Sequence, residues 1–322
     1  MRVLVTGVAG FIGFHVAAAL AARGDAVIGI DNLDPYYSVR LKRDRLAQLP
    51  AGVRVIEADF ADAAALARAL DGEAFDRIVH LGAQAGVRHS IDNPAAYGRA
   101  NLVGQLNILE LARARRVEHL VYASSSSVYG DAGAGPLSVK ARADRPVSLY
   151  AATKRSGELM TESYAHLYRL PTTGLRFFTV YGPWGRPDMA VWLFTAAILE
   201  RRPIRVFNGG ALRRDFTYID DIAAGVLAAL DRPPSDDGGA SPHLIYNIGH
   251  GRPEALGDLI AAIEAACGEP AIRELVPMQP GDVTATFADI APIARDLGYA
   301  PITTIAEGVP RFVDWYRRYV AT

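Results

Sequence analysis

Tyr150 and Lys154 stand four residues apart in the segment SLYAATK. On a helix, this spacing places both side chains on one face. An ammonium group beside a phenol lowers the pKa of the phenol from about 10 toward neutrality, and a phenolate can act as a general base. Such pairs also occur on helix faces that meet only solvent. Whether this pair does chemistry therefore depends on what the rest of the chain places near it.

Three glycines, Gly7, Gly10 and Gly13, occur at regular spacing in TGVAGFIG. The apolar residues 3–6 before them predict a buried strand, and an amphipathic helix is expected to begin near Phe11. Between a strand and a helix, such glycines let the backbone turn tightly and approach a pyrophosphate, while the helix N-terminus supplies amide donors. Close packing of strand and helix would also explain them. The motif favours dinucleotide binding if an acidic residue follows at the right distance.

Asp31 meets that condition, because it ends the second predicted strand 18 residues beyond Gly13. A carboxylate there can accept from both ribose hydroxyls and would repel a 2'-phosphate, which favours NAD over NADP. A helix N-cap is the alternative role. Asp59 ends VRVIEADF and is expected near the adenine end of the cofactor, although a turn residue would look the same.

Four consecutive serines, residues 124–127, follow the apolar segment HLVYA. We expect them at the C-terminal end of a strand, where ligands bind in open parallel sheets. Side chains alternate along a strand, so Ser125 and Ser127 should point to one side. The run can also be a simple turn. Strand-end hydroxyls directed toward Tyr150 and Lys154 are nevertheless a specific combination in a dinucleotide-binding fold.

Apolar strand-like runs alternate with helix-period segments along the chain. The runs are RVLVTG, AVIGID, VRVIEAD, RIVHLGA, HLVYASSS and TTGLRFF. This alternation predicts an α/β fold with a Rossmann-type, doubly wound parallel sheet. FTYIDDIAAGVLAAL is predicted as a helix and HLIYNIG as a strand that returns to the sheet. We therefore expect an NAD-binding domain of residues 1–176, with 215–250 returning to it, and a smaller C-terminal α/β substrate-binding region of residues 177–214 and 251–322.

The composition excludes several classes of function. The 322 residues include 34 basic and 35 acidic side chains, and the net charge of -1 gives no reason to expect nucleic acid or anionic membrane as a partner. The single cysteine, Cys267, fits a cytoplasmic protein, and the seven histidines lack metal-ligand spacing. We expect a small-molecule ligand, no metal and no membrane span.

The sequence resembles, over essentially its whole length, the extended short-chain dehydrogenases/reductases that include the nucleotide-sugar epimerases and dehydratases. The resemblance is carried by TGVAGFIG, DNLDPYYSVRLKRDRL, AQAGVRHS, ASSSSVYG, SLYAATK, RFFTVYGPWGRPDMA, RRDFTYIDDI and MQPGDVTATFADI. Within this family, the sequence is most similar to the group that epimerises UDP-glucuronate at C4. The resemblance implies tightly held NAD, and UDP-glucuronate and UDP-galacturonate as substrate and product.

In the implied reaction, Tyr150 takes the proton of the sugar 4-hydroxyl and the C4 hydride passes to NAD. The keto-sugar then turns and takes the hydride back on its other face. Counting back from Tyr150 as in family members points to Ser125 as the hydroxyl that orients the sugar oxygen, with Ser127 as second choice. Lys154, with the positive nicotinamide, would tune the base. The residues implied to line NAD are Gly7, Gly10, Phe11, Ile12, Gly13, Asp31, Asn32, Asp59, Phe60, Leu81, Ala83, Gln84, Asn101, Tyr150, Lys154 and Phe177.

Oxidation of a uronate at C4 produces a β-keto acid, which can lose its carboxylate as CO2. Side chains that hold the carboxylate near the carbonyl plane would suppress this loss. Thr179 offers a hydroxyl and Arg186 a fork of donors in RFFTVYGPWGRPDMA. Arg88 is a third candidate, although a structural ion pair would explain it equally well. Arg186 could alternatively be a surface arginine in a proline-braced loop.

The nucleotide end is expected against the C-terminal region. The resemblance places Arg214 beside the diphosphate and Asp282 near the uridine ribose, and Gln279 stands where galactose-type epimerases usually have arginine. Met189 and Thr195 would frame the uracil, unless they only pack in the core. The residues expected around the substrate are Arg88, Ser126, Thr179, Arg186, Met189, Arg214, Gln279 and Asp282.

Several alternatives remain open. A 4,6-dehydratase would need an Asp-Glu pair where Ser126 and Ser127 stand. A UDP-glucuronate decarboxylase shares the keto intermediate, and a UDP-galactose or UDP-glucose 4-epimerase is disfavoured by Thr179 and Gln279. An NAD-binding sensor without catalysis would have no reason to keep Tyr150, Lys154 and the serines. Amphipathic helices expected over residues 101–115 and 150–170 resemble the pair that forms a homodimer in this family, although they could pack only within one subunit.

Overall fold

The computed structural model describes residues 1–131, 135–277 and 285–321. In these residues, the main sheet has seven strands in the order β12-β7-β5-β4-β1-β2-β3, and neighbouring strands are parallel. The strands are β1 (Arg2–Thr6), β2 (Ala26–Asp31), β3 (Val53–Glu57), β4 (Arg77–His80), β5 (His119–Ser125), β7 (Thr172–Phe177) and β12 (His243–Ile248). The strand order reverses between β1 and β4, and doubly wound sheets bind ligands at such a point. The predicted Rossmann-type α/β fold is confirmed.

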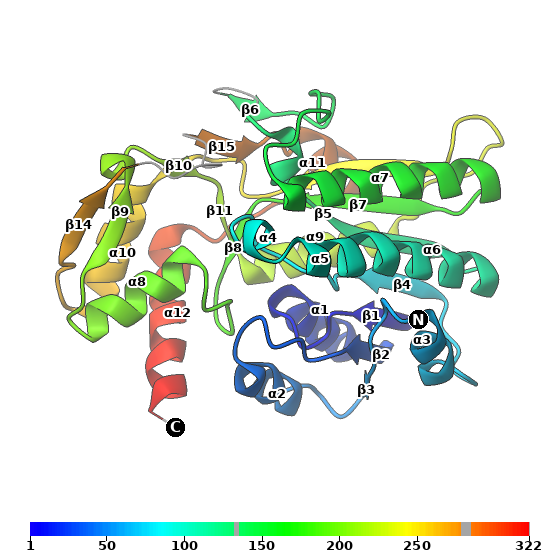
Figure 1. Cartoon of the computed structure of the whole chain (residues 1–322), viewed down its shortest axis with the longest axis horizontal. Coiled ribbons are helices and arrows are strands. Elements are labelled where there is room, and N and C mark those ends of the chain that lie inside the picture. The colour runs from blue at the N-terminus through cyan, green and yellow to red at the C-terminus, as the bar shows by residue number, and fades with distance from the viewer. Residues whose placement is uncertain (132–134, 278–284, 322) are drawn as a thin grey trace.

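Successive side chains of β1 enter two different cores. Val3 and Val5 pack with side chains of α1 (Phe11–Ala22) and α9 (Ile219–Asp231), whereas Leu4 packs with those of α6 (Gly104–Arg115). Alternate side chains of a strand point to opposite faces, so these helices cover both faces of the sheet. The central strands β5 and β7 are therefore buried along almost their whole length, as in other parallel sheets. α7 (Leu149–Tyr168) lies beside α6 in Figure 1.

A second, smaller group of elements lies beside the large sheet, at the left of Figure 1. It contains α8 (Ala190–Leu199), α10 (Leu256–Cys267), α12 (Ile305–Val320) and the parallel strand pair β9 (Ile204–Phe207) and β14 (Arg273–Val276). Phe194, Ile260 and Phe312 from these helices belong to the same apolar cluster as Val3 and Val5. The two groups therefore share one continuous core.

Short elements complete the described part of the chain. The helices are α2 (Val39–Ala47), α3 (Ala63–Ala69), α4 (His89–Asp92), α5 (Pro94–Tyr97) and α11 (Ala291–Leu297). The strands β6 (Pro136–Leu137), β10 (Arg213–Arg214), β13 (Glu254–Ala255) and β15 (Ala285–Ala288) form one small sheet. β8 (Thr179–Tyr181) pairs in parallel with β11 (Phe216–Tyr218).

Two predicted elements differ from the structure. FTYIDDIAAGVLAAL is not one helix, because residues Phe216–Tyr218 form β11 and α9 begins only at Ile219. The buried Asp215 carboxylate explains the extended start: it accepts the backbone N–H groups of His250, Gly251 and Ala288, at 2.6 to 3.0 Å. The helix expected from residue 101 becomes α-helical only at Gly104, and a π-helical segment, Gly98–Val103, precedes it.

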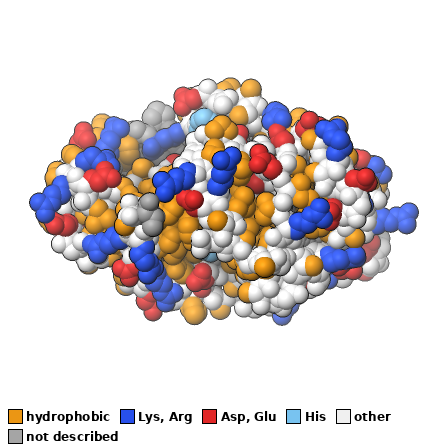
Figure 2. All heavy atoms as spheres, turned by 90° about the horizontal axis from the view of Figure 1, so that it is seen from below, with side chains coloured by type: hydrophobic (Ala, Val, Ile, Leu, Met, Phe, Trp, Pro, Cys, Tyr) orange, Lys and Arg blue, Asp and Glu red, His pale blue; other side chains and the backbone are white. Residues whose placement is uncertain are grey.

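The surface carries both signs of charge. Basic and acidic side chains are interspersed over the face drawn in Figure 2, with hydrophobic side chains between them. This agrees with the near-zero net charge of the chain. Among the residues that the structure describes, no helix has the length and apolar character needed to cross a membrane.

Candidate active site

A large pocket opens at the C-terminal ends of the main strands. Its volume is about 930 Å³. Gly7 after β1, Asp31 on β2, Leu81 after β4, Ser125 on β5 and Phe177 on β7 all line it. Parallel strands end at the same edge of a sheet, so residues far apart in the sequence meet here.

The glycine-rich segment forms one wall of this pocket, through Gly7, Gly10, Phe11, Ile12 and Gly13. Gly7 has φ 73°, and a Cβ on it would lie 2.7 Å from the backbone N of Gly82. A Cβ on Gly13 would lie 2.0 Å from the carbonyl oxygen of Gly7. Close packing of the backbone alone therefore requires glycine at Gly7 and Gly13. α1 begins at this turn without a side-chain cap, and such a helix N-terminus suits a diphosphate.

Asp31 is buried at the end of β2, on the pocket wall. Its carboxylate accepts the N–H groups of Ala9, at 3.0 Å, and Leu33, at 2.8 Å. Burial raises the pKa of Asp31, and the nearby ammonium of Lys42 acts in the opposite direction. Asp31 is not a helix N-cap, because Ser38 caps α2 by accepting from the N–H of Leu41. The position fits a ribose-binding carboxylate.

Asp59 also reaches the pocket, where it pairs with Arg99 at 2.5 Å. It accepts the N–H of Ala61 as well, so the turn interpretation is also correct. Asn32, Phe60, Leu81, Ala83, Gln84 and Phe177, all expected around NAD, line the same pocket.

Asn101 differs from the prediction, because it is buried and does not belong to the pocket wall. Its amide accepts from the N–H of Gln84, at 2.8 Å, and donates to the Gln84 carbonyl and the Thr153 hydroxyl, each at 3.0 Å. It therefore joins the loop after β4 to α7.

Tyr150 and Lys154 lie in the first two turns of α7, which Ser148 caps by accepting from the N–H of Ala151. Both side chains line the pocket beside Ser125, Ser126 and Ser127. The Lys154 ammonium donates to the carbonyl of Ala123 at 2.9 Å, which attaches α7 to β5. The structure thus brings together the predicted tyrosine, lysine and serines.

Ser125 and Ser127 meet for a different reason from the one expected. β5 ends at Ser125, and the next four residues form a 3₁₀ turn rather than more strand. The turn folds Ser127 back, so that its hydroxyl donates to the Ser125 hydroxyl at 2.9 Å. The Ser125 oxygen therefore accepts a hydrogen bond from Ser127, and the Ser125 hydroxyl can donate a hydrogen bond toward the pocket.

The protein groups around Tyr150 act in both directions on the pKa of its phenol. Burial raises the pKa of Tyr150, while a hydrogen bond with Ser125 and the positive charge of Arg186 oppose this rise. Lys154 is directed to the Ala123 carbonyl, and burial lowers the pKa of its ammonium to about 8, against the attraction of Glu158. The protein groups alone therefore leave the pKa of Tyr150 raised, and the expected lowering depends on the positive nicotinamide that the prediction also included.

Thr179 and Arg186 line the same pocket. Arg186 donates through Nε and a terminal nitrogen to the two oxygens of Asp188, at 3.0 and 2.5 Å. Tyr36 donates to Asp188 at 3.0 Å. Arg186 is therefore a fixed pocket residue and not a loose surface arginine.

The remaining substrate-side predictions have mixed outcomes. Arg88, Met189 and Arg214 line the pocket, and the Arg88 guanidinium lies 5.1 Å from the centre of the Phe207 ring. Thr195 is fully buried inside α8 and is not part of the pocket wall, so its role is packing. Gln279 and Asp282 lie outside the described residues.

Several wall residues escaped the sequence analysis: Tyr36, Lys42, His89, Asp188 and Phe207. Asp188 had a usable signal, because it follows Arg186 by two residues in one loop. Tyr36 had no such signal in the sequence, because only the fold brings its hydroxyl to Asp188. Within the described ranges, no three His, Cys, Asp or Glu side chains are grouped to hold a metal ion.

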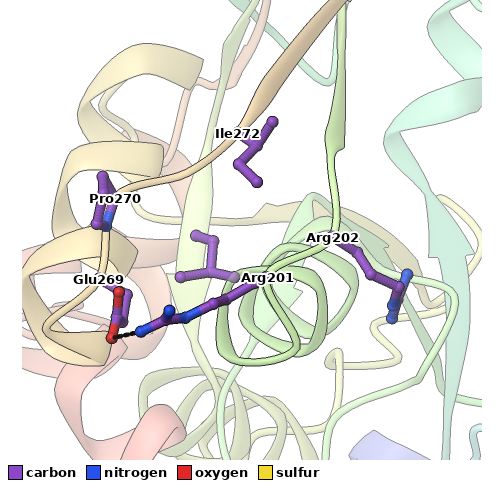
Figure 3. Close-up of a pocket in the computed structure, with 6 residues that line it drawn as sticks. Arg201, Arg202, Glu269, Pro270 and Ile272 are labelled. Carbon is purple, nitrogen blue, oxygen red and sulfur yellow. Dashed lines mark hydrogen bonds and ion pairs between the residues drawn. The ribbon is translucent and has the colours of Figure 1, made fainter.

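A smaller hollow of about 190 Å³ lies between the end of α8 and the segment before β14 (Figure 3). Its charged side chains are already paired near the surface, Arg201 with Glu269 at 2.9 Å and Arg202 with Glu200 at 2.5 Å. No group there resembles the acid-base arrangement of the large pocket.

Comparisons with known proteins agree with this geometry. The NAD dependent epimerase/dehydratase family matches residues 3–249. The chain is 48% identical to a probable UDP-glucuronate 4-epimerase of Rhizobium meliloti (strain 1021), over 98% of this chain and 97% of that protein. It is 46% identical to UDP-glucuronate 4-epimerase 3 of Arabidopsis thaliana, over 98% of this chain and 76% of that protein. Among solved structures, it is similar to UDP-glucuronic acid 4-epimerase from Bacillus cereus in complex with UDP-glucuronic acid and NAD, with a TM-score of 0.90, 32% identity, and coverage of 99% and 100% of the two chains. The chain therefore belongs to the NAD dependent epimerase/dehydratase family.

Proposed function

We propose that this protein interconverts UDP-glucuronate and UDP-galacturonate by inverting C4 through a transient ketone. The observation that carries the proposal is the joint presence, in one pocket, of Tyr150 beside Ser125 and of Arg186 held in a fixed orientation. The first pair suits proton transfer at a hydroxyl, and the arginine suits a carboxylate. The relatives named above have this activity in their names.

NAD fits the other end of the pocket. The glycine-rich turn leaves room for a diphosphate beside the N-terminus of α1, and Asp31 presents a buried carboxylate to a ribose. When bound, NAD takes up a hydride from C4 and returns it, so that no net oxidation occurs. We expect the cofactor to be released slowly and to copurify with the protein.

Proton transfer at the sugar is assigned to Tyr150. Its phenolate would accept the 4-hydroxyl proton as the ketone forms and return it after inversion. Ser125, supported by the donor from Ser127, would orient the sugar oxygen. Lys154, positively charged and anchored at Ala123, would favour the phenolate once a cationic ring also lies nearby.

Thr179 and Arg186 are assigned to the sugar carboxylate. In the 4-keto intermediate, loss of CO2 breaks the C5–C6 bond and leaves its electron pair on an enolate of the C4 ketone. Protonation at C5 would then give a 4-keto-pentose. Donors that hold the carboxylate near the carbonyl plane disfavour this step, because the breaking bond must stand perpendicular to that plane.

The two ends of the pocket suggest a division of labour. Residues 1–176 and 215–250 would hold NAD, and residues 177–214 and 251–322 would hold the UDP-sugar, with Arg214 at the diphosphate.

We also propose a homodimer through α6 and α7, on which Leu106, Leu159 and Leu167 are 41%, 56% and 63% exposed. A sedimentation mass near the 34.6 kDa of one chain would contradict the dimer. The single cysteine keeps the cytoplasm as our expected location.

The deciding experiment incubates the purified protein with UDP-glucuronate, without added NAD, and identifies the products by NMR. UDP-galacturonate without CO2 is the expected result. UDP-xylose or a 4-keto-pentose would instead indicate a decarboxylase. No turnover of UDP-glucuronate, with turnover of UDP-galactose, would assign the pocket to neutral sugars.

A further inference from the structure

The turn that leads into Arg186 adopts a backbone conformation that must be held in place. Between β8 and Arg186, Gly182 has φ 147° and Trp184 has φ 62°. The Trp184 value lies in the left-handed region, which residues with a side chain seldom adopt. A Cβ on Gly182 would also lie 2.4 Å from Ile219. The position of Arg186 therefore depends on whatever stabilises residues 183–185.

Arg45 supplies that support from α2, the helix that follows Asp31 in the chain. Its Nε donates to the Trp184 carbonyl at 3.0 Å, and one terminal nitrogen donates to the Trp184 and Gly185 carbonyls at 2.7 and 2.9 Å. The other terminal nitrogen donates to the Ala9 carbonyl, at 2.9 Å, and to the Tyr37 hydroxyl, at 2.7 Å. All five N–H donors of the guanidinium are thus used. Arg45 is 0% exposed.

His15 supports the same turn from α1. Its Nε2 donates to the Pro183 carbonyl at 2.9 Å, and its ring lies edge to face against Phe11 and Phe14. Burial lowers the pKa of His15 to about 4, so the ring is neutral near neutral pH and one nitrogen keeps its hydrogen for this bond. Three consecutive carbonyls of the turn, those of residues 183–185, are therefore bound by two side chains of the first fifty residues.

The geometry points to Arg45, assisted by His15, as a positioning residue that sets the distance between the glycine-rich turn and the carboxylate-binding Arg186. One guanidinium binds Ala9, inside the glycine-rich turn, and Gly185, next to Arg186. The inference rests on the proposed function. Its consequence is that Arg45 controls how often the 4-keto intermediate keeps its carboxylate, because a misplaced Arg186 no longer holds that group near the carbonyl plane.

The sharpest variant is Arg45→Lys. It keeps the positive charge, but an ammonium has three donors and no planar fork, so it cannot bind Ala9, Trp184 and Gly185 together. The matched control is Arg43→Lys, because Arg43 is an exposed residue of the same helix. Each protein is given UDP-glucuronate labelled with ¹³C at C6, and NMR measures labelled CO2 and bicarbonate against UDP-galacturonate. Bound NAD per chain and the melting temperature are measured in parallel.

Wild type and Arg43→Lys are expected to give almost only UDP-galacturonate. Arg45→Lys should keep most of its NAD, turn over at least roughly tenfold more slowly, and release a several-fold larger fraction of its product as CO2. The fraction matters more than the rate, because a purely structural defect reduces the amount of active enzyme without changing the ratio of its products. An unchanged ratio in folded, NAD-containing Arg45→Lys would overturn the inference.

Three further outcomes of the experiment also bear on the inference. If Arg45→Lys does not fold, His15→Leu takes its place, since it removes only the donor to Pro183, and an unchanged product ratio there would overturn the inference equally. If wild type itself does not turn over UDP-glucuronate, the proposed function fails and the inference fails with it. Wild-type epimerisation with no effect of either variant would reject the positioning role alone.

Discussion

The two ends of the pocket are built differently. The cofactor end is made of short segments at successive strand ends, and its acidic residues accept backbone N–H groups, as Asp31 does from Ala9 and Leu33. The substrate end is made of side chains that support one another across large sequence distances, as Tyr36 and Arg186 do through Asp188. Under the proposed function, the difference teaches that cofactor binding is largely a local property of βα turns, whereas substrate selection depends on how the second region is held against the first.

Replacing Tyr150 should have the largest effect, because both ends of the pocket serve its chemistry. Tyr150→Phe removes the proton acceptor and is expected to lower kcat by about 10²- to 10⁴-fold, with bound NAD unchanged. Steady-state turnover of UDP-glucuronate and the NAD absorbance of the denatured protein check this. Tyr164→Phe, on the same helix, is the control. Activity near wild type would remove Tyr150 from the mechanism.

Replacing Arg186 tests the substrate end alone. Arg186→Ala should reduce kcat/KM for UDP-glucuronate by roughly 10- to 100-fold, since it removes charge-assisted hydrogen bonds to the carboxylate. NAD content should not change, and Arg202→Ala, at an exposed site, should behave as wild type. Kinetics with UDP-glucuronate and NMR of the products provide the measurement. If Arg186→Ala turned over UDP-glucuronate normally, the carboxylate would be held elsewhere.

Replacing Asp31 tests the cofactor end. Asp31→Asn keeps the shape but removes the charge, so NAD should be retained roughly tenfold more weakly, and NADP should be less strongly excluded. Gel filtration followed by cofactor assay, with and without added NAD or NADP, measures both effects. Asp71→Asn, on an exposed residue, is the control. Equal NAD retention in the two variants would argue against a ribose contact.

The smallest effect concerns stability and pH. Burial lowers the pKa of His15 and His119 to about 4 and that of His80 to about 3, against an ordinary value of 6.5. Unfolding restores the ordinary pKa, so below about pH 6.5 the unfolded chain binds more protons than the folded chain. The free energy of unfolding should therefore fall as the pH is lowered from about 6.5 to 4, by up to about 1.4 kcal/mol per pH unit for each histidine.

Thermal melting between pH 7.5 and 4.5 follows this loss. His119→Gln should reduce the number of protons taken up on unfolding by about one, so that the free energy of unfolding declines less steeply as the pH is lowered. His166→Gln, at an exposed position, should not have this effect. A melting temperature that stays constant over this range would show that the three rings do not remain neutral in the folded protein.

Much of the cofactor end could be predicted from the sequence, because its signals are local. The glycine spacing, the strand-end position of Asp31 and the i, i+4 pair Tyr150 and Lys154 each lie within one or two elements, and the pocket contains all of them. Asn101 was expected on the wall of the pocket, but the structure places it behind the wall, in the buried interior. Its burial depends on Gln84 and Thr153, which come from two other elements.

The substrate end of the pocket was harder to predict from the sequence, because its side chains depend on partners that are distant in the chain. Thr179 and Arg186 were proposed from the donors that their side chains offer to a carboxylate. Asp188 had a local signal, but nothing in the sequence indicates that Tyr36 donates to Asp188 and so helps to fix the arginine. The serine run shows the same limit at short range. The alternation of side chains along a strand predicted Ser125 and Ser127 on one side of the strand. In the structure, a 3₁₀ turn instead brings the two hydroxyl oxygens to 2.9 Å from each other.

The sequence by itself determined the alternating α/β fold, the dinucleotide end of the pocket and the residue types available for proton transfer. These follow from periodicity and spacing within single elements, which the backbone geometry of strands and helices translates directly into position. Only the tertiary structure decided the orientation of Arg186, the contact of Lys154 with Ala123 and the use of all five Arg45 donors. These arrangements depend on contacts between segments far apart in the chain, and their separation in sequence carries no distance information, so only the packing of the folded chain could bring them together.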